Sequence, residues 1–302
     1  TKKANNNNNN DDDDDNNDDD NDVVSHIYLI RHGDRWDYAN PSSWIELAKR
    51  TKNLVTDPSL SPLGHVQATE TSVALLQDIT SQTPKKKATT RILSSPYLRV
   101  IQTSVPTANA LGLPICIEEG LSEAMITPGK LPSPSERFAY FPQIDTDYES
   151  ILRVKATPGF HCEKTGYPCE AFAGKYVKRM EVMAKLLEEK YHGQTVVCFS
   201  HAASIALVAA LLRCDLEGMK FAPCGIYHLV RKKGVDKWEL VTDGSTNAPH
   251  VSENSETTYP WGFRERHFQE GTDNNNARHG SSEGIDLQYF VEDKKNANSC
   301  RL

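Results

Sequence analysis

Short apolar runs alternate with longer stretches of helical periodicity through the middle of the chain. The strand candidates are brief runs bounded by turn residues: 24–30, 91–94, 114–117 and 195–199. Residues 226–230 and 238–241 flank Lys232-Lys233-Gly234 and predict an antiparallel hairpin at a sheet edge. Strands separated by helices favour an α/β three-layer sandwich with a mostly parallel, doubly wound sheet and an antiparallel edge strand.

Four segments have the apolar spacing of helices: 61–80, 95–111, 169–191 and 202–212. Ser61-Pro62 and Ser95-Pro96 each offer a capping serine followed by a proline suited to the first turn. In the first helix, the positions at helical spacing are Val66, Thr69, Val73 and Leu76. In the third, the predicted apolar face comprises Phe172, Tyr176, Met180, Met183 and Leu187.

Composition divides the chain into three parts. Residues 1–22 hold nine Asp against Lys2 and Lys3, a net charge of −7. Removing them from the 34 basic and 41 acidic residues leaves 32 of each (34 − 2 and 41 − 9). We expect this tail to be disordered, because it has almost no apolar surface to bury. The globular domain is expected over 23–243, with an insertion around 118–168 and a polar, irregular segment over 244–302.

Several classes of protein are disfavoured. No stretch approaches the roughly 20 apolar residues that span a bilayer, and Lys85-Lys86-Lys87 alone does not make a nucleic-acid site. No signal-peptide pattern is present, which favours a cytoplasmic location, although a chain beginning at Thr1 leaves open a targeting segment upstream. The seven cysteines are odd in number and scattered. Cys162 and Cys169 are interpreted as loop thiols, with a disulfide or a metal site as alternatives.

Polar groups follow three of the predicted strands, at the edge where ligands bind in such folds. They are Arg31-His32-Gly33 with Arg35, Ser94-Ser95-Pro96 with Arg99, and Ser200-His201. A neutral imidazole is a good nucleophile, and arginine forks bind phosphoryl oxygens. This set predicts phosphoryl transfer to a histidine. An acid for the leaving group would come from Glu118, Glu119 or Glu123, and spacing does not choose between them.

Four motifs carry a resemblance to a known family. They are Arg31-His32-Gly33, the segment Ser94 to Thr103 containing Arg99, Gly120-Leu121-Ser122-Glu123, and Ser200 to Ser204. In this order they resemble the histidine phosphatase superfamily (phosphoglycerate mutase-like). Arg35, the segment Asp57 to Gly64, and Gln67-Ala68 are closest to the branch of the Sts-type phosphatases.

The resemblance implies a metal-independent phosphomonoesterase of the histidine acid phosphatase type, without an organic cofactor. His32 would be the nucleophile that becomes phosphorylated. The phosphate would be bound by Arg31, Arg35, Arg99 and His201. Glu123 would protonate the leaving group. A phosphoglycerate-type mutase and a phosphatase-like binding module are the alternatives.

The sequence departs from the family at Asp34, where the Sts-like motif has Glu, and over 127–168, which matches nothing alignable. The expected partner is therefore only a small phosphorylated substrate or a phosphoprotein, with a homodimer left open. Some roles also stay open. Ser200 and Ser204 could cap a helix or bind phosphate, Arg35 could pair with Asp34 or Asp37, and His250 could be structural or functional. The aromatic side chains of Trp36, Tyr38 and Trp44 could line the site or pack in the core.

Overall fold

The computed structural model describes residues 24–51, 56–82, 89–123, 131–154, 173–256 and 262. The predicted tail over 1–22, most of the segment beyond 256, and part of the insertion lie outside these residues. So do Lys85 to Lys87 and the pair Cys162 and Cys169. No helix among the described residues combines the length and apolarity that crossing a membrane requires.

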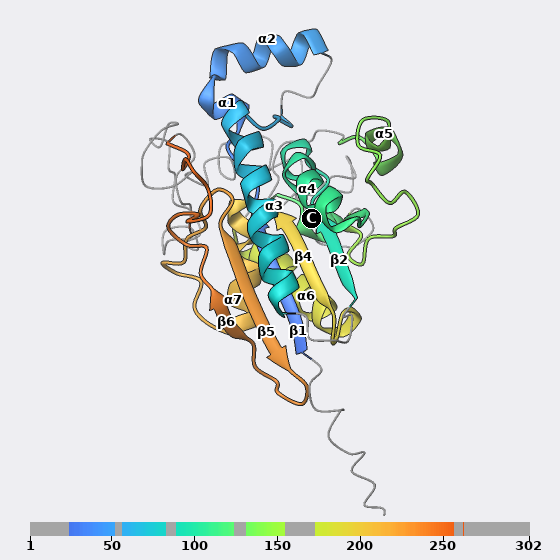
Figure 1. Ribbon diagram of the computed structural model, residues 1–302, viewed down its shortest axis with the longest axis vertical. Coiled ribbons are helices and arrows are strands. Elements are labelled where there is room, and N and C mark those ends of the chain that lie inside the picture. Colours follow the sequence, from blue (N-terminus) through green and yellow to red (C-terminus); the bar gives the residue numbers. More distant parts are fainter. Residues whose placement is uncertain are drawn as a thin grey trace, which may run out of the picture.

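One six-stranded sheet forms the centre of the domain, in the order β3-β2-β4-β1-β5-β6. The strands are β1 (Val24–Arg31), β2 (Thr90–Ser94), β3 (Ile115–Ile117), β4 (Thr195–Ser200), β5 (Ile226–Lys232) and β6 (Glu239–Thr242). The pairs β3-β2, β2-β4 and β4-β1 are parallel, whereas β5 is antiparallel to β1 and β6 to β5. The sheet is therefore mostly parallel with an antiparallel hairpin at one edge, which confirms the predicted fold class (Figure 1).

Helices cover both faces of the sheet. They are α1 (Trp36–Ala39), α2 (Pro41–Thr51), α3 (Pro62–Gln82), α4 (Leu98–Leu111), α5 (Pro134–Phe138), α6 (Ala173–Lys190) and α7 (Ile205–Leu212), with 3-10 turns η1 (Glu119–Leu121) and η3 (Ala202–Ser204). The pair α3 and α4 packs on one face and the pair α6 and α7 on the other (Figure 1). Short α1 and α2 lie beyond the carboxyl end of β1.

Alternation along β1 explains the two layers of core. Ile27 and Leu29 point to α6 and α7, while Tyr28 and Ile30 point to α3 and α4. All four are at most 3% exposed. Because both faces of the sheet are covered, the central strands read as continuous apolar runs rather than as alternating ones. Each such buried side chain stabilises the fold by about 1.5–3 kcal/mol.

The predicted apolar face of α3 is wrong, although the helix exists. Val66 and Val73 are 49% and 52% exposed, whereas Leu75 is fully buried. Gln67 and Thr71 are also fully buried. They replace apolar residues on the inner face because each has a polar partner: the Gln67 amide oxygen accepts from the backbone N–H of Asp34, and the Thr71 hydroxyl bonds His250. Hydrophobic spacing alone therefore assigned the solvent-facing side of α3 to the core.

The predicted start of the next helix is also wrong. Helix α4 begins at Leu98, and Ser95 does not cap it. Its cap comes from a distant residue, since Asp57 Oδ1 accepts the Leu98 N–H at 2.8 Å. The end of α4 is as expected, because Gly112 takes a left-handed φ of 64°. The Ser95 hydroxyl instead hydrogen-bonds His201.

A polar cluster lies between β1, β5 and α3, away from the strand ends. His26 Nδ1 is 3.0 Å from His228 Nε2, and His228 Nδ1 is 3.3 Å from Asp78 Oδ2. The His228 ring stacks on Tyr28 at 3.9 Å between centroids. Burial lowers the pKa of His228 to about 4 and also lowers that of His26.

This cluster predicts acid sensitivity of the fold. Both histidines bind protons more weakly when folded than at their ordinary pKa of 6.5, so stability is lost as the pH falls from 6.5 toward about 4. Over the interval from pH 6.5 to pH 5, and discounted for solvent screening, the expected loss is about 1–2 kcal/mol. Urea unfolding at pH 7.5 and pH 5 measures it. His228→Phe, which keeps the stacking on Tyr28, should flatten this difference; an unchanged pH slope would contradict the assignment.

Candidate active site

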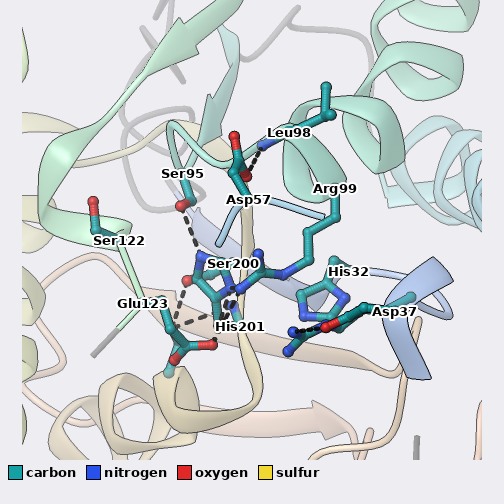
Figure 2. Close-up of polar contacts among 12 residues, drawn as sticks. His32, Asp37, Asp57, Ser95, Leu98, Arg99, Ser122, Glu123, Ser200 and His201 are labelled. Carbon is teal, nitrogen blue, oxygen red and sulfur yellow. Dashed lines mark hydrogen bonds and ion pairs between the residues drawn. The ribbon is translucent and has the colours of Figure 1, made fainter. Parts of the chain in front are cut away.

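The parallel strands end in line and bring the predicted residues together. Arg31 is paired with Ser200 across β1 and β4, and Ser94 with Phe199 across β2 and β4. The ladder continues one residue further, since the His32 N–H donates to Ser200 O at 3.0 Å and the Ser95 N–H to Phe199 O at 3.1 Å. His32, Ser95 and His201 therefore share one edge, with Arg99 reaching in from α4 (Figure 2).

The protonation of His32 is fixed by its nearest neighbour. His32 is 2% exposed, and its Nδ1 lies 2.8 Å from the Gly33 carbonyl oxygen. A carbonyl only accepts hydrogen bonds, so Nδ1 carries the proton and Nε2 keeps its lone pair. Burial, followed by the charges of Arg99, Arg31 and Arg35, holds the pKa of His32 well below 6.5. The ring is therefore neutral near pH 7.

Glycine is required beside this histidine. A Cβ on Gly33 would lie 2.8 Å from the Gly64 carbonyl oxygen. The close approach joins the turn after β1 to the first turn of α3. The Gly33 N–H also donates to Thr103 Oγ1 at 3.2 Å, which connects the same turn to α4. The orientation of His32 is thus set by backbone packing from two helices.

His201 is completely buried and bonded on both ring nitrogens. Its Nε2 is 2.8 Å from Ser95 Oγ, and its Nδ1 is 3.2 Å from Arg99 Nη2. Burial and then Arg99 hold the pKa of His201 well below its ordinary value, so the ring is neutral. Because Arg99 only donates, His201 Nδ1 accepts and its Nε2–H donates to Ser95. The His32 and His201 rings meet edge to face at 5.5 Å.

Three arginines surround the two rings. Arg31 is fully buried and donates from Nη1 to Phe221 O at 2.6 Å. Burial lowers the pKa of Arg31 to about 10 and also lowers the pKa of Arg99, with Arg35 contributing in both cases. Among the described residues, the buried Nε and Nη1 of Arg99 have no hydrogen-bond partner. A guanidinium group with available donors, placed beside other positive charges, can bind an anion.

Arg35 pairs with Asp37, one of the two partners considered. Its Nε and Nη2 donate to the Asp37 carboxylate at 3.0 and 2.7 Å, and its Nη1 donates to Tyr38 OH at 3.0 Å. Burial alone would lower the pKa of Arg35, but Tyr38 and Asp37 raise it above its ordinary value. Asp34 instead accepts from Ser61 Oγ at 2.6 Å. These three hydrogen bonds use three of the five guanidinium N–H groups of Arg35.

The structure separates the three candidate carboxylates. Glu123 Oε2 lies 3.3 Å from His201 Nδ1 and 3.5 Å from Arg99 Nη2, and its side chain is 24% exposed. Glu118 is fully buried, and its carboxylate accepts from backbone N–H groups and hydroxyls within 118–152. Glu119 lies in η1, where its N–H donates to Ser150 Oγ. Glu123 is thus the carboxylate placed against both His201 and Arg99 (Figure 2).

The family assignment follows from a comparison of the sequence with known families. The model of the histidine phosphatase superfamily (branch 1) matches residues 27–244. The chain belongs to this superfamily. Its matched region contains both strand-end histidines, the arginines around them and Glu123. A comparison with curated protein sequences found no match.

Solved structures of similar fold also come from phosphatases. The ecdysone phosphate phosphatase of Bombix mori, solved with tungstate, has a TM-score of 0.52 at 17% identity, covering 88% of this chain and 100% of the other. A phosphoserine phosphatase of Entamoeba histolytica has a TM-score of 0.43 at 21% identity, covering 75% and 98%. At 17% identity, the first match shows a similarity of fold alone.

The structure also describes four other positions considered from sequence: Ser200, Ser204, His250 and Trp44. Ser200 Oγ donates to Leu121 O at 2.8 Å, and Ser204 Oγ is 2.9 Å from Tyr176 OH. The helix expected from residue 202 begins with the 3-10 turn η3 before α7. His250 Nε2 bonds Thr71 Oγ1 at 3.0 Å. Trp44 is 2% exposed, which favours its core interpretation.

Sequence reasoning missed two residues that shape this site and the contact made by a third. Ser95 was placed among the polar groups at the strand ends and interpreted as a helix cap, but it bonds His201. Tyr97 packs edge to face on His201, with ring centroids 4.9 Å apart, and lies 4.6 Å from the Arg99 guanidinium carbon. Arg179 in α6 contacts the Glu123 backbone. Its signal was present, because an arginine three residues after Tyr176 stands within the predicted apolar face.

The described residues include no group of three or more His, Cys, Asp and Glu side chains placed to hold a metal ion. The metal independence implied by the family resemblance stays a prediction.

The His32 tautomer gives a direct spectroscopic prediction. The long-range proton–nitrogen spectrum should show His32 protonated on Nδ1 alone at pH 6, because its pKa lies well below 6.5. An exposed histidine would be largely protonated on both nitrogens at that pH. Assignment uses the spectrum of His32→Gln, which lacks these signals. Detection of an imidazolium at pH 6, or of a proton on Nε2, would contradict the geometry described above.

Proposed function

We propose that this protein is a phosphatase that hydrolyses a phosphomonoester through a phosphohistidine intermediate on His32. The observation that carries the proposal is the bond from His32 Nδ1 to Gly33 O, which leaves the Nε2 lone pair available in a neutral ring. A nucleophile of this kind splits a difficult displacement into two easier ones. Family membership over residues 27–244 supports it.

The first step transfers the phosphoryl group to the enzyme. His32 Nε2 attacks phosphorus in line with the ester oxygen, so that the N–P bond forms as the P–O bond breaks. Glu123, protonated at this stage, gives its proton to the departing oxygen and becomes a carboxylate. Its contact with His201 at 3.3 Å supports this role, because the His201 ring in turn lies 5.5 Å from the ring of His32.

The cations would stabilise the charge that develops in this step. Arg99 offers two buried donors, and Arg31 and Arg35 add fixed positive charge. Donors already held in place need no reorganisation as the transition state forms, which makes such groups effective in a buried site. His201 would assist through Arg99 and Glu123, both of which it contacts.

Water completes the cycle in the second step. The Glu123 carboxylate accepts a proton as the water oxygen attacks phosphorus, the N–P bond breaks and inorganic phosphate leaves. The acid is thereby restored for the next turnover. A mutase would instead return the phosphoryl group to a second hydroxyl before water enters.

The branch and the substrate belong to the same proposal. Arg35 and the segment Asp57 to Gly64 support placement beside the Sts-type phosphatases, and the relatives with an arginine at this position favour hydrolysis over transfer. The proposed enzyme class is a phosphomonoesterase of the histidine acid phosphatase type. Its proposed substrate is a small phosphorylated compound or a phosphoprotein.

The test is a product assay on the purified full chain. We expect release of inorganic phosphate from p-nitrophenyl phosphate and from at least one member of a panel of sugar phosphates, nucleotides and phosphotyrosine peptides. Incubation of 3-phosphoglycerate with and without 2,3-bisphosphoglycerate separates the mutase, which would form 2-phosphoglycerate instead of phosphate. Absence of both products across the panel would favour a binding module and contradict the proposal.

A further inference from the structure

A fully buried arginine on α6 holds the backbone that carries Glu123. Arg179 Nη1 donates to Gly120 O at 2.7 Å, and Nη2 donates to Ser122 O at 3.0 Å and Glu123 O at 3.2 Å. Its guanidinium carbon also lies 4.7 Å from the Tyr176 ring centroid. Burying a charge is costly unless it is hydrogen-bonded, so these carbonyls are part of what keeps Arg179 in place.

The same turn is packed tightly against α6. A Cβ on Gly120 would lie 2.5 Å from Met183 Sδ and 3.0 Å from Glu118 Oε1. The Gly120 N–H donates to that Glu118 oxygen at 3.0 Å. Glu118 therefore holds the amide side of the turn, while Arg179 holds its carbonyl side. Glu123 is the last residue of the backbone segment held in this way, and its side chain contacts His201 and Arg99.

The chemistry of arginine suits this task. A planar guanidinium can point two nitrogens at several carbonyls in a fixed geometry, whereas the ammonium of lysine is a single flexible donor centre. Proton transfer requires an acid within hydrogen-bond distance of the leaving oxygen, and a shift of about 1 Å can lower a rate about 10²-fold.

We propose that Arg179 is a positioning residue for the proton donor, fixing the Glu123 carboxyl group against the leaving oxygen. The inference rests on the proposed function, in which Glu123 is the acid. Arg179 would act through Glu123 and not through the nucleophile or the phosphate contacts. Its loss should therefore matter most when the leaving group needs a proton.

Leaving groups separate this role from a structural one. The phenolate of p-nitrophenyl phosphate departs without protonation, whereas the alkoxide of 2-glycerophosphate needs an acid. In Glu123→Gln we expect kcat/KM to fall by about 10²- to 10⁴-fold for the alkyl ester and by roughly tenfold or less for the aryl ester. In Arg179→Lys we expect roughly a 10- to 100-fold loss for the alkyl ester and a change within about threefold for the aryl ester.

The ratio of the two kcat/KM values is the readout, because it does not depend on the fraction of protein that folds. Arg137→Lys is the matched control: it alters another buried arginine, which pairs with Asp57 and Pro96 O beside α4. That variant should change kcat/KM by the same factor for both substrates. Adding Arg179→Lys to Glu123→Gln should produce no further loss on the alkyl ester. Arg179→Gln repeats the comparison if the lysine variant does not fold.

Three results would overturn the inference, and they differ in whether the proposed function also fails. Equal losses on both esters in the Arg179 variants, or additive losses in the double variant, would make Arg179 structural while the proposed function stands. An unchanged ratio in Glu123→Gln would remove Glu123 as the acid and the role of Arg179 with it.

Discussion

Replacing His32 with alanine is expected to lower kcat/KM for any accepted phosphomonoester by roughly 10⁴- to 10⁶-fold, as loss of a covalent nucleophile does in other enzymes. The physical reason is that the other neutral histidine beside the arginines cannot replace it, because both ring nitrogens of His201 are hydrogen-bonded: Nδ1 accepts from Arg99 and Nε2–H donates to Ser95. Initial-rate assays with p-nitrophenyl phosphate measure the effect.

The fold should survive this substitution. The His32 side chain bonds only the carbonyl of the adjacent residue in the described structure, and its backbone N–H remains in the ladder with Ser200. We expect the free energy of unfolding in urea to fall by no more than about 3 kcal/mol. His32→Asn provides a second variant with a polar side chain. Turnover within tenfold of the unmodified protein in either folded variant would contradict the proposed mechanism.

Replacing Arg99 with methionine is the second large expected effect. Removal of one preorganised donor to a developing anion lowers kcat by about 10²–10³-fold in comparable sites, and Arg99 offers two buried donors. Inhibition by inorganic phosphate should weaken in parallel, because the same donors would bind the product. Arg99→Lys keeps the positive charge but loses the planar guanidinium, so its activity should lie between that of the unmodified protein and that of Arg99→Met.

Arg99 also affects the protonation of the histidines. Its charge contributes to lowering the pKa of both His32 and His201. In Arg99→Met the two pKa values should therefore rise, and the nucleophile should begin to be lost by protonation at a higher pH than in the unmodified protein. The nitrogen spectrum of His32 reports this directly. Normal phosphate inhibition together with an unchanged His32 titration would remove Arg99 from the proposed anion site.

Much of the site could be predicted because it lies at strand ends. The run from Thr195 to Phe199 is apolar on both faces, so its boundary is sharp, and His201 is located within a residue. The same holds for Arg31 and His32 after β1. Parallel pairing then forces these ends to one edge, which the alternation of strands and helices already indicated.

Other features depended on partners that are remote in the sequence. The apolar spacing predicted the position of α3 correctly but predicted the wrong face to be buried. The buried face contains Gln67 and Thr71, which hydrogen-bond Asp34 and His250. Ser95 has the residue type and position of a helix cap, but Asp57 accepts the hydrogen bond from the Leu98 N–H at the start of α4. The choice among Glu118, Glu119 and Glu123 required the path of the chain after β3, which no local pattern determines.

The most direct test of the account is the position of the phosphoryl group in the trapped intermediate. Reaction with p-nitrophenyl phosphate, an alkaline quench and peptide mapping by mass spectrometry should find an acid-labile phosphate on the peptide containing His32. Comparison with the two phosphohistidine standards should place it on Nε2, because Nδ1 is bonded to the Gly33 carbonyl. Phosphate on Nδ1 or on His201, or rapid turnover with no phosphohistidine at all, would contradict the central claim.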